Sequence, residues 1–288
     1  MTEATAAPLF PVRPGVDFYC VVGNPIGHSL SPKIHRAFAD QLGHQLDYVR
    51  VELPREGFNA GLAAFIAAGG RGMNITVPFK EDAFAACGSL TARALAAGAV
   101  NTICVQSDGH VLGDNTDGEG LVRDLKDNLG AKLRGASVLM IGAGGAARGV
   151  ITPLFEAGIA RLVLLNRTPA RAQALAQRFT DFTIQSGGLE TVPDAPVSVV
   201  INATAGGLTG ERPQIDPKWL DAQSFCYDMV YGPAARPFLD WAEARGVARS
   251  ADGLGMLVEQ AAAAFAMWRG QRPETGPVIE ALRVAAKA

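Results

Sequence analysis

The stretch SVLMIGAGGAARG, residues 137–149, contains the pattern that decides the fold. An apolar run comes first, and Gly142, Gly144 and Ala147 follow with the spacing G-x-G-x-x-G/A. Between a strand and a helix, such small residues allow a tight turn and let a pyrophosphate approach the backbone N–H groups at the positive end of the helix. The stretch therefore predicts a dinucleotide-binding loop, and the alternative is a glycine turn with a purely structural role.

Short runs rich in β-branched and aromatic residues alternate with helical stretches on both sides of this loop. Helices between sequential strands favour right-handed crossovers and a mostly parallel sheet. A shift in composition at GDNTDGEG, residues 113–120, separates two such blocks. We therefore expect two α/β domains joined near Asp117, with the final helices packed on one of them. The expected strands cover residues 18–23, 46–53, 72–77, 137–142, 161–167, 197–204 and 224–231, and the expected helices cover residues 31–43, 56–70, 121–130, 146–158, 168–179, 253–270 and 274–286.

The composition is that of a nearly neutral α/β protein. Of its 288 residues 48% are hydrophobic and 19% are charged, and the formal net charge is -2. No run of one charge suggests a nucleic-acid or membrane-surface partner. No apolar stretch approaches the ~20 residues of a membrane span, and the first residues do not resemble a signal peptide. The four cysteines and four histidines are too dispersed for a metal site, so we expect a cytoplasmic protein without a metal.

The end of the strand expected at residues 161–167 determines which dinucleotide the loop favours. An acidic side chain at this place accepts a hydrogen bond from the 2′-hydroxyl of NAD. The chain instead has Asn166, Arg167 and Thr168, with Arg171 one helical step further on. Because guanidinium groups form charge-assisted bonds to phosphate oxygens, the two arginines favour the 2′-phosphate of NADP. The alternative is that both arginines are solvated at the start of a helix.

The segment GNPIGHSLSPKIH, residues 23–35, follows the first strand with more polar groups than a turn requires. Ser31, followed by Pro32, is expected to cap the N-terminus of the next helix. Open α/β sheets bind their ligands at such carboxyl ends of strands. Amides, hydroxyls, an ammonium and a carboxylate recur at the other strand ends of this domain, which favours a site for a polyol. These residues are Asn74, Thr76, Lys80, Asn101, Thr102 and Asp117.

Taken together, the motifs resemble the shikimate dehydrogenase family. The chain contains GNPIGHSLSP, NITVPFK, GAVNT, GDNTDG, GAGGA, NRT, INAT and GLGMLVEQA in the family's order, over nearly the whole length after the N-terminal tail. The resemblance implies reversible, NADPH-dependent reduction of 3-dehydroshikimate to shikimate in aromatic amino-acid biosynthesis. It also implies a substrate-binding domain at residues 1–116, completed by the C-terminal helices at 253–288, and a Rossmann-like NADP-binding domain at 117–252.

The same resemblance implies a set of site residues. Ser29 and Ser31 would hydrogen-bond the substrate carboxylate. Lys80 and Asp117 would form the catalytic pair, with Asp117 also binding the substrate. The residues that would line the ring hydroxyls are Asn74, Thr76, Asn101, Tyr231 and Gln260. The residues that would contact the cofactor are Gly142, Ala143, Gly144, Gly145, Ala146, Asn166, Arg167, Thr168, Arg171, Met229 and Gly253.

Two other functions compete with this one. Quinate/shikimate dehydrogenases with broader substrate or NAD use tend to carry an acidic residue in place of Asn166 or Arg167, or altered paired serines, and this chain has neither change. A catalytically silent NADPH-binding sensor has no need for a proton-transfer pair, whereas Lys80 and Asp117 are both present. The sequence leaves open the choice between monomer and homodimer, the exclusion of quinate, residual NAD use, the extent of domain closure and the division of proton transfer within the pair.

Overall fold

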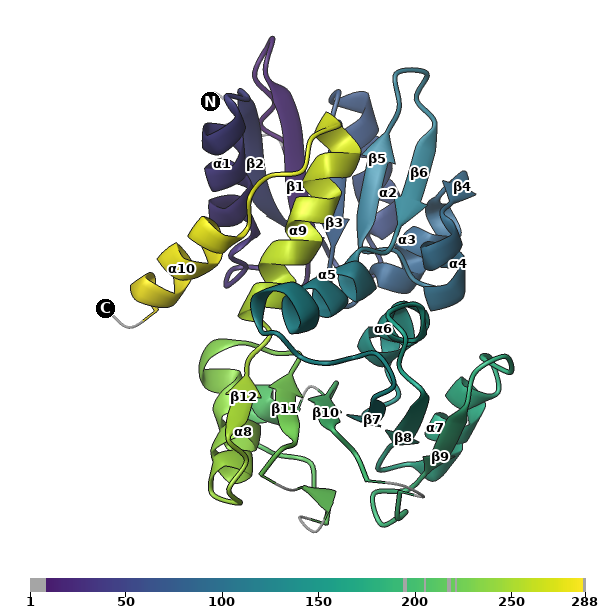
Figure 1. Cartoon of the computed structure of the whole chain (residues 1–288). Coiled ribbons are helices and arrows are strands. Elements are labelled where there is room, and N and C mark those ends of the chain that lie inside the picture. Colours follow the sequence, from purple (N-terminus) through teal and green to yellow (C-terminus); the bar gives the residue numbers. More distant parts are fainter. Residues whose placement is uncertain (1–8, 194–195, 205, 217–218, 221, 287–288) are drawn as a thin grey trace. The chain divides into compact units, whose positions relative to one another are not determined.

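The computed structural model describes residues 9–193, 196–204, 206–216, 219–220 and 222–286 (Figure 1). Contacts divide the chain into two compact units, Met1–Thr116 with Ala261–Val278 and Asp117–Gln260 with Ile279–Ala288. The boundary between Thr116 and Asp117 lies within residues 113–120, where the composition of the sequence changes. Of the C-terminal residues 253–288, only 261–278 group with the first unit. The binding roles expected of the two domains stay predictions.

The first unit is built on a six-stranded sheet with the strand order β2-β1-β3-β5-β6-β4 (Figure 1). β1 pairs in parallel with β2 and β3, as the helices between these strands require. β5 pairs antiparallel with both β3 and β6, and this hairpin and the short β4 were not predicted. The elements are β1 (Asp17–Gly23), α1 (Ser31–Leu42), β2 (Leu46–Glu52), α2 (Phe58–Ala67), β3 (Gly72–Ile75), α3 (Lys80–Ala86), β4 (Ser89–Leu90), α4 (Ala92–Ala97), β5 (Thr102–Val105) and β6 (Val111–Asp114).

Successive residues of β1 are buried on opposite faces of this sheet. Phe18 and Val22 pack with Phe65 of α2 in one apolar cluster. Tyr19 belongs to a second cluster, in which Trp268 of α9 (Leu254–Arg269) covers the other face. Because a shift of one residue would exchange the two faces, this double burial fixes the register of β1.

The second unit has six parallel strands in the order β12-β11-β10-β7-β8-β9. This is the doubly wound order of a Rossmann-like sheet, with its switch point between β7 and β10. The predicted fold class, two α/β domains with a Rossmann-like second one, is confirmed. The elements are α5 (Asp117–Arg123), the π-helical turn η1 (Asp124–Asn128), β7 (Ser137–Ile141), α6 (Gly145–Glu156), β8 (Arg161–Leu165), α7 (Pro169–Ala176), β9 (Ile184–Gly187), β10 (Val199–Asn202), η2 (Gly206–Thr209), β11 (Phe225–Asp228), η4 (Gly232–Ala235), α8 (Arg236–Glu243) and β12 (Arg249–Ala251). α9 and α10 (Gly276–Ala285) each have residues in both units.

The helix expected at residues 121–130 begins earlier, at Asp117. It packs closely on its neighbours, because a Cβ added to Gly118 would lie 2.2 Å from Pro153 Cγ of α6. A Cβ added to Gly120 would lie 2.8 Å from Gln260 Cβ of α9. Glycines at these two positions therefore let the helix that begins with Asp117 contact α6 and the first half of α9.

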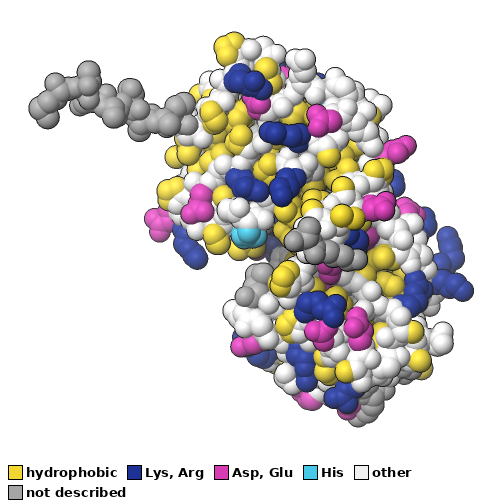
Figure 2. Space-filling model, turned by 90° about the vertical axis from the view of Figure 1, so that its left-hand side faces the viewer, with side chains coloured by type: hydrophobic (Ala, Val, Ile, Leu, Met, Phe, Trp, Pro, Cys, Tyr) yellow, Lys and Arg dark blue, Asp and Glu magenta, His cyan; other side chains and the backbone are white. Residues whose placement is uncertain are grey.

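On the face shown in Figure 2, basic and acidic side chains are interspersed with uncharged ones. Among the described residues, no helix combines the length and apolarity needed to cross a membrane, and no group of three or more histidine, cysteine or acidic residues could hold a metal ion. All four cysteines are free thiols. The polar residues singled out by the sequence lie instead at the ends of strands.

Candidate active site

Two loops at the carboxyl ends of β1 and β3 carry the first group of predicted residues. β1 and β3 are neighbours in the sheet, and the chain visits the outer strand β2 between them, so their ends flank a topological switch point. A Cβ added to Gly23 would lie 2.6 Å from Thr76 Cγ2. The Asn24 backbone N–H donates to the Val77 carbonyl over 3.0 Å. The loop that leads to the paired serines is therefore fastened to the loop that leads to Lys80.

Ser29 and Ser31 are hydrogen-bonded to each other. Ser29 Oγ donates to Ser31 Oγ over 3.2 Å and accepts from the Ser31 backbone N–H over 3.3 Å. The predicted N-cap at Ser31 is wrong, because Leu30 holds that position and no side chain caps α1. Leu30 already has helical backbone angles, so Ser31 is the first helical residue, and its hydroxyl is not used to cap the helix. Gly43 follows the last residue of α1 and ends the helix with a left-handed φ of 69°.

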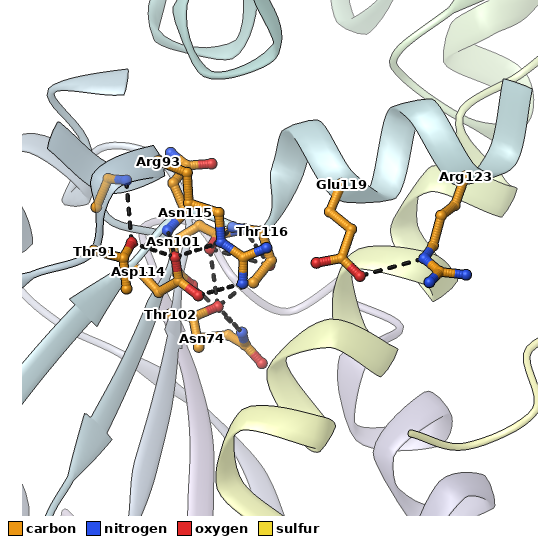
Figure 3. Close-up of polar contacts among 11 residues, drawn as sticks. Asn74, Thr91, Arg93, Asn101, Thr102, Asp114, Asn115, Thr116, Glu119 and Arg123 are labelled. Carbon is orange, nitrogen blue, oxygen red and sulfur yellow. Dashed lines mark hydrogen bonds and ion pairs between the residues drawn. The ribbon is translucent and has the colours of Figure 1, made fainter. Parts of the chain in front are cut away.

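A buried network connects Asn74 of β3 to Asn101 beside β5 (Figure 3). Asn74 Nδ2 donates to Thr102 Oγ1 over 3.1 Å and to the Asn101 carbonyl over 3.3 Å. Thr102 Oγ1 donates to Asn101 Oδ1 over 2.8 Å. Asn101 Oδ1 also accepts from the Thr116 N–H over 2.9 Å. All four residues are at most 5% exposed. Their side chains are therefore oriented before any ligand binds.

Arg93 fixes the loop that leads to Asp117. Its guanidinium donates to the Asp114 carboxylate through Nε over 2.7 Å and through Nη2 over 2.5 Å, and the Thr91 hydroxyl adds a bond of 2.6 Å (Figure 3). Burial alone would raise the pKa of Asp114, but the Arg93 and Thr91 donors outweigh it, and the pKa is lowered. Asp114 thus stays ionised and holds residues 114–116 directly before Asp117.

The predicted catalytic pair combines one residue from each unit. Lys80 is half-buried and begins α3, where its carbonyl accepts from the Val100 N–H over 2.9 Å. Asp117 is 7% exposed and begins α5. Each side chain therefore stands at the first residue of a helix that follows a polar strand end. Their action on one substrate stays a prediction.

The glycine-rich loop lies after β7, at the switch point of the second sheet. Gly142 has a φ of 112°, and an added Cβ would lie 3.0 Å from the Ala203 carbonyl carbon, so a side chain would be strained there. A Cβ added to Gly144 or Gly145 would meet nothing within 4 Å. Gly144 precedes α6, whose N-terminus has no side-chain cap. Open space beside such N–H groups fits a pyrophosphate.

The predicted ribose-phosphate residues lie in the turn between β8 and α7 and, for Arg171, in the first turn of α7. Arg167, Thr168 and Arg171 are exposed, and neither arginine forms an ion pair within the described ranges. Asn166 Nδ2 donates to the Thr168 carbonyl over 3.0 Å, which shapes the turn. The donor set, two guanidiniums with no carboxylate among residues 166–171, fits a 2′-phosphate.

The remaining predicted residues lie in the loop after β11, between β12 and α9, and on α9. A Cβ added to Gly253 would lie 2.4 Å from the Met229 carbonyl oxygen, so these two predicted cofactor contacts touch through their backbones. Tyr231 is half-buried two residues after Met229. Gln260 is 9% exposed and donates from Nε2 to the Leu257 carbonyl of its own helix over 2.7 Å.

Comparisons with known proteins identify the family. Residues 21–103 match the shikimate dehydrogenase substrate binding domain, residues 124–209 match the shikimate / quinate 5-dehydrogenase model, and residues 253–283 match the shikimate 5'-dehydrogenase C-terminal domain. Proteins named shikimate dehydrogenase (NADP(+)) from Thioalkalivibrio sulfidiphilus and Alkalilimnicola ehrlichii are 51% and 52% identical to the chain. Each alignment covers 93% of the chain and 98% of the relative. The chain belongs to the shikimate dehydrogenase family.

The structure agrees with that membership. The crystal structure of shikimate 5-dehydrogenase from Thermus thermophilus, in complex with NADP(H) and shikimate, has a TM-score of 0.82 and 35% identity to the chain. The match covers 94% of this chain and 100% of the other. The two-unit architecture therefore matches a shikimate dehydrogenase along almost its full length.

One polar pair of the second sheet, beside its switch point, was not predicted from the sequence. Asn202 Nδ2 donates to Asp228 Oδ2 over 2.8 Å, and Asp228 Oδ1 accepts from the Val230 N–H over 3.0 Å. Burial raises the pKa of Asp228 to about 6, although both bonds favour the carboxylate. The sequence signal that could have identified the two residues is that each one ends an apolar strand. The structure adds that they are register partners.

Proposed function

We propose that the chain catalyses the reversible, NADPH-dependent reduction of 3-dehydroshikimate to shikimate. It acts in this proposal as an NADP-dependent oxidoreductase on a secondary alcohol. The observation that carries the proposal is the buried, pre-oriented Asn74–Asn101 network, in a chain that also has open space beside Gly144 and Gly145. Two relatives named shikimate dehydrogenase (NADP(+)), which are 51% and 52% identical to the chain over 93% of its length, support NADP as the cofactor.

The second unit holds NADP in this proposal, and Gly144, Gly145, Arg167 and Arg171 are exposed. Residues 142–146 bind the pyrophosphate at the start of α6, and Asn166 and Thr168 shape the turn beside it. Arg167 and Arg171 bind the 2′-phosphate, since neither guanidinium is paired with another described residue. Met229 and Gly253 contact the cofactor further along the sheet edge. When bound, NADPH supplies the hydride to the ring carbonyl carbon.

The first unit holds the substrate by its carboxylate and its ring hydroxyls. Ser29 and Ser31 donate hydrogen bonds to the carboxylate, and the N-terminus of α1 adds a favourable potential for an anion. Asn74, Thr76 and Asn101 bind ring hydroxyls. Tyr231, Gln260 and Asp117 complete the set of residues that the family resemblance assigns to the substrate.

Lys80 and Asp117 handle the proton. Reduction of a ketone leaves an oxyanion that must receive a proton from a group within hydrogen-bond reach. In the reductive direction Lys80 donates this proton to the substrate oxygen, and Asp117 orients both the ammonium and the hydroxyl. In the oxidative direction the pair receives the proton.

Initial rates with shikimate and quinate, each with NADP and with NAD, test the proposal. We expect shikimate with NADP to give the highest kcat/KM of the four combinations. Comparable rates with quinate or NAD would favour the quinate/shikimate dehydrogenase alternative. NADPH binding without turnover of either substrate would favour a silent sensor. The cytoplasmic location and the choice between monomer and homodimer stay predictions.

A further inference from the structure

Tyr48 of β2 contacts a predicted substrate-binding residue, Asn74, but has no role in the proposed mechanism. Its hydroxyl donates to Asn74 Oδ1 over 2.7 Å, and the side chain is only 6% exposed. The Ser31 hydroxyl also lies close enough to the phenol to affect its titration. Tyr48 therefore stands between the serines proposed for the carboxylate and the amide proposed for a ring hydroxyl.

The contacts of Asn74 determine what this amide can offer a ligand. Both Nδ2 donations, to Thr102 Oγ1 and to the Asn101 carbonyl, go to protein groups. Oδ1 accepts one bond, from Tyr48. An amide oxygen has two lone pairs, so Asn74 retains one acceptor site and no unused donor within the described part of the chain.

The surroundings of Tyr48 hold the phenol in its donating position. The His35 ring of α1 stacks on the Tyr48 ring, with centroids 4.2 Å apart and an interplanar angle of 7°. Burial raises the pKa of Tyr48 well above its usual value, which keeps the hydroxyl proton in place. Burial also lowers the pKa of His35 to about 3, although its interaction with Asn74 acts in the opposite direction, so the stacked imidazole is neutral.

We propose that Tyr48 is a positioning residue that makes Asn74 an acceptor-only reader of substrate hydroxyls. This inference rests on the proposed function of the site. The Tyr48 phenol holds Asn74 Oδ1, and Thr102 holds Asn74 Nδ2. The Asn74 amide therefore cannot rotate by 180° to present its NH₂ group to the substrate. Asn74 thus selects a ring hydroxyl that donates a hydrogen bond, and it discriminates against a carbonyl or an ether at the same ring position.

The first test is Tyr48→Phe, with Tyr19→Phe as the matched control. Tyr19 is the register partner of Tyr48 on β1 and is likewise buried, but its hydroxyl accepts from Arg269 over 3.4 Å. Loss of one hydrogen bond predicts a rise of about threefold to tenfold in KM for shikimate for Tyr48→Phe, with kcat and KM for NADP unchanged. Tyr19→Phe should leave KM for shikimate unchanged. Equal KM values in Tyr48→Phe and the wild type would overturn the inference.

A double-mutant cycle with Asn74→Ala shows whether Tyr48 acts through the amide. We expect Tyr48→Phe to raise KM no further in the Asn74→Ala background. A full additional rise there would overturn the positioning role and would indicate a separate effect on packing. Wild-type turnover of shikimate, measured first, separates this outcome from failure of the proposed function.

A measurement on the wild-type protein covers the case in which Tyr48→Phe does not fold. Each ring hydroxyl that is not oxidised is replaced in turn by fluorine, which cannot donate a hydrogen bond. One of the two analogues should bind about threefold to tenfold more weakly than shikimate to the wild type. The same analogue should show no such penalty with Asn74→Ala. Unchanged affinity for both analogues would contradict an acceptor-only Asn74.

Discussion

The strand ends of the first sheet and the predicted nucleotide loops of the second sheet differ in how far their side chains are fixed before a ligand binds. In the first, Asn74, Asn101 and Asp114 are nearly inaccessible and bonded to neighbouring side chains. In the second, Gly144 borders open space and Arg171 is exposed. A site for several small hydroxyls needs fixed donors and acceptors, whereas a site for phosphates can rely on backbone N–H groups and exposed charges.

This contrast predicts two kinds of mutational effect. A substitution within the buried Asn74–Asn101 network of the first region removes a ligand contact and also leaves buried partners unsatisfied, so binding and stability change together. A substitution at an exposed arginine of the second region removes a ligand contact and little else, so binding changes alone. The following expected outcomes probe that difference.

Lys80→Ala is expected to have the largest effect. A general acid typically contributes about 10²–10⁴-fold in rate, so kcat should fall by about that factor while KM for shikimate stays nearly constant. Asp117→Asn should behave similarly. The Lys33 side chain of α1 provides the control, since Lys33→Ala should keep the wild-type rate. A Lys80→Ala enzyme with normal kcat and a raised KM would make Lys80 a binding residue only.

The double substitution Ser29→Ala and Ser31→Ala should have the second largest effect, in this case on KM for shikimate. Hydrogen bonds to a charged group contribute about 1.5–3 kcal/mol each, so KM for shikimate should rise about a hundredfold or more. Because neither hydroxyl caps α1, the melting temperature of Ser31→Ala should stay close to that of the wild type. Ser198→Ala, on the surface of the second unit, is the control. Unaltered KM with a lowered melting temperature would assign Ser31 to the helix alone.

Arg171→Ala should weaken the binding of NADP about tenfold to a hundredfold and leave NAD binding nearly unchanged. The melting temperature should not move, because the side chain is exposed and unpaired among the described residues. Arg178→Ala, in an exposed position just after α7, should change neither affinity. Parallel losses for NADP and NAD would show that Arg171 does not read the 2′-phosphate.

Asn101→Ala extends the comparison to stability. Its amide oxygen accepts from Thr102 and from the Thr116 N–H, and both donors are buried. Each group left unsatisfied costs about 1–3 kcal/mol, so the free energy of unfolding should fall by at least that amount. Chemical denaturation of Asn101→Ala beside Arg171→Ala measures the difference. Equal stability of the two variants would remove the contrast between the regions.

The sequence predicted those parts of the fold that depend on local pattern. The alternation of strands and helices and the glycine spacing at Gly142 and Gly144 were sufficient for two α/β domains and a Rossmann-like sheet. The β5–β6 hairpin was missed, because its strands have only four residues each and a weak alternation. The N-cap at Ser31 was wrong because Leu30 adopts helical angles that no local signal reveals.

The site was predictable in residue type but not in hydrogen-bond partner. Asn74 and Asn101 were identified by their place at strand ends, and their network through Thr102 follows from the register of β3 with β5. The role of Tyr48 was invisible, because tyrosine in a strand is ordinarily a packing residue. Asp228 and Asn202 were missed for a related reason, since only the register of β10 with β11 brings them together.

Hydrogen–deuterium exchange of the full chain with each ligand alone tests the central claim most directly, namely that the first region holds shikimate and the second holds NADP. Shikimate alone should slow exchange at residues 29–31 and 76–80 and leave residues 142–146 and 166–171 unchanged. NADP alone should slow exchange at residues 142–146 (the glycine loop) and 166–171 and leave exchange at residues 29–31 (the serine loop) unchanged. Protection of the serine loop by NADP alone, or of the glycine loop by shikimate alone, would contradict the assignment.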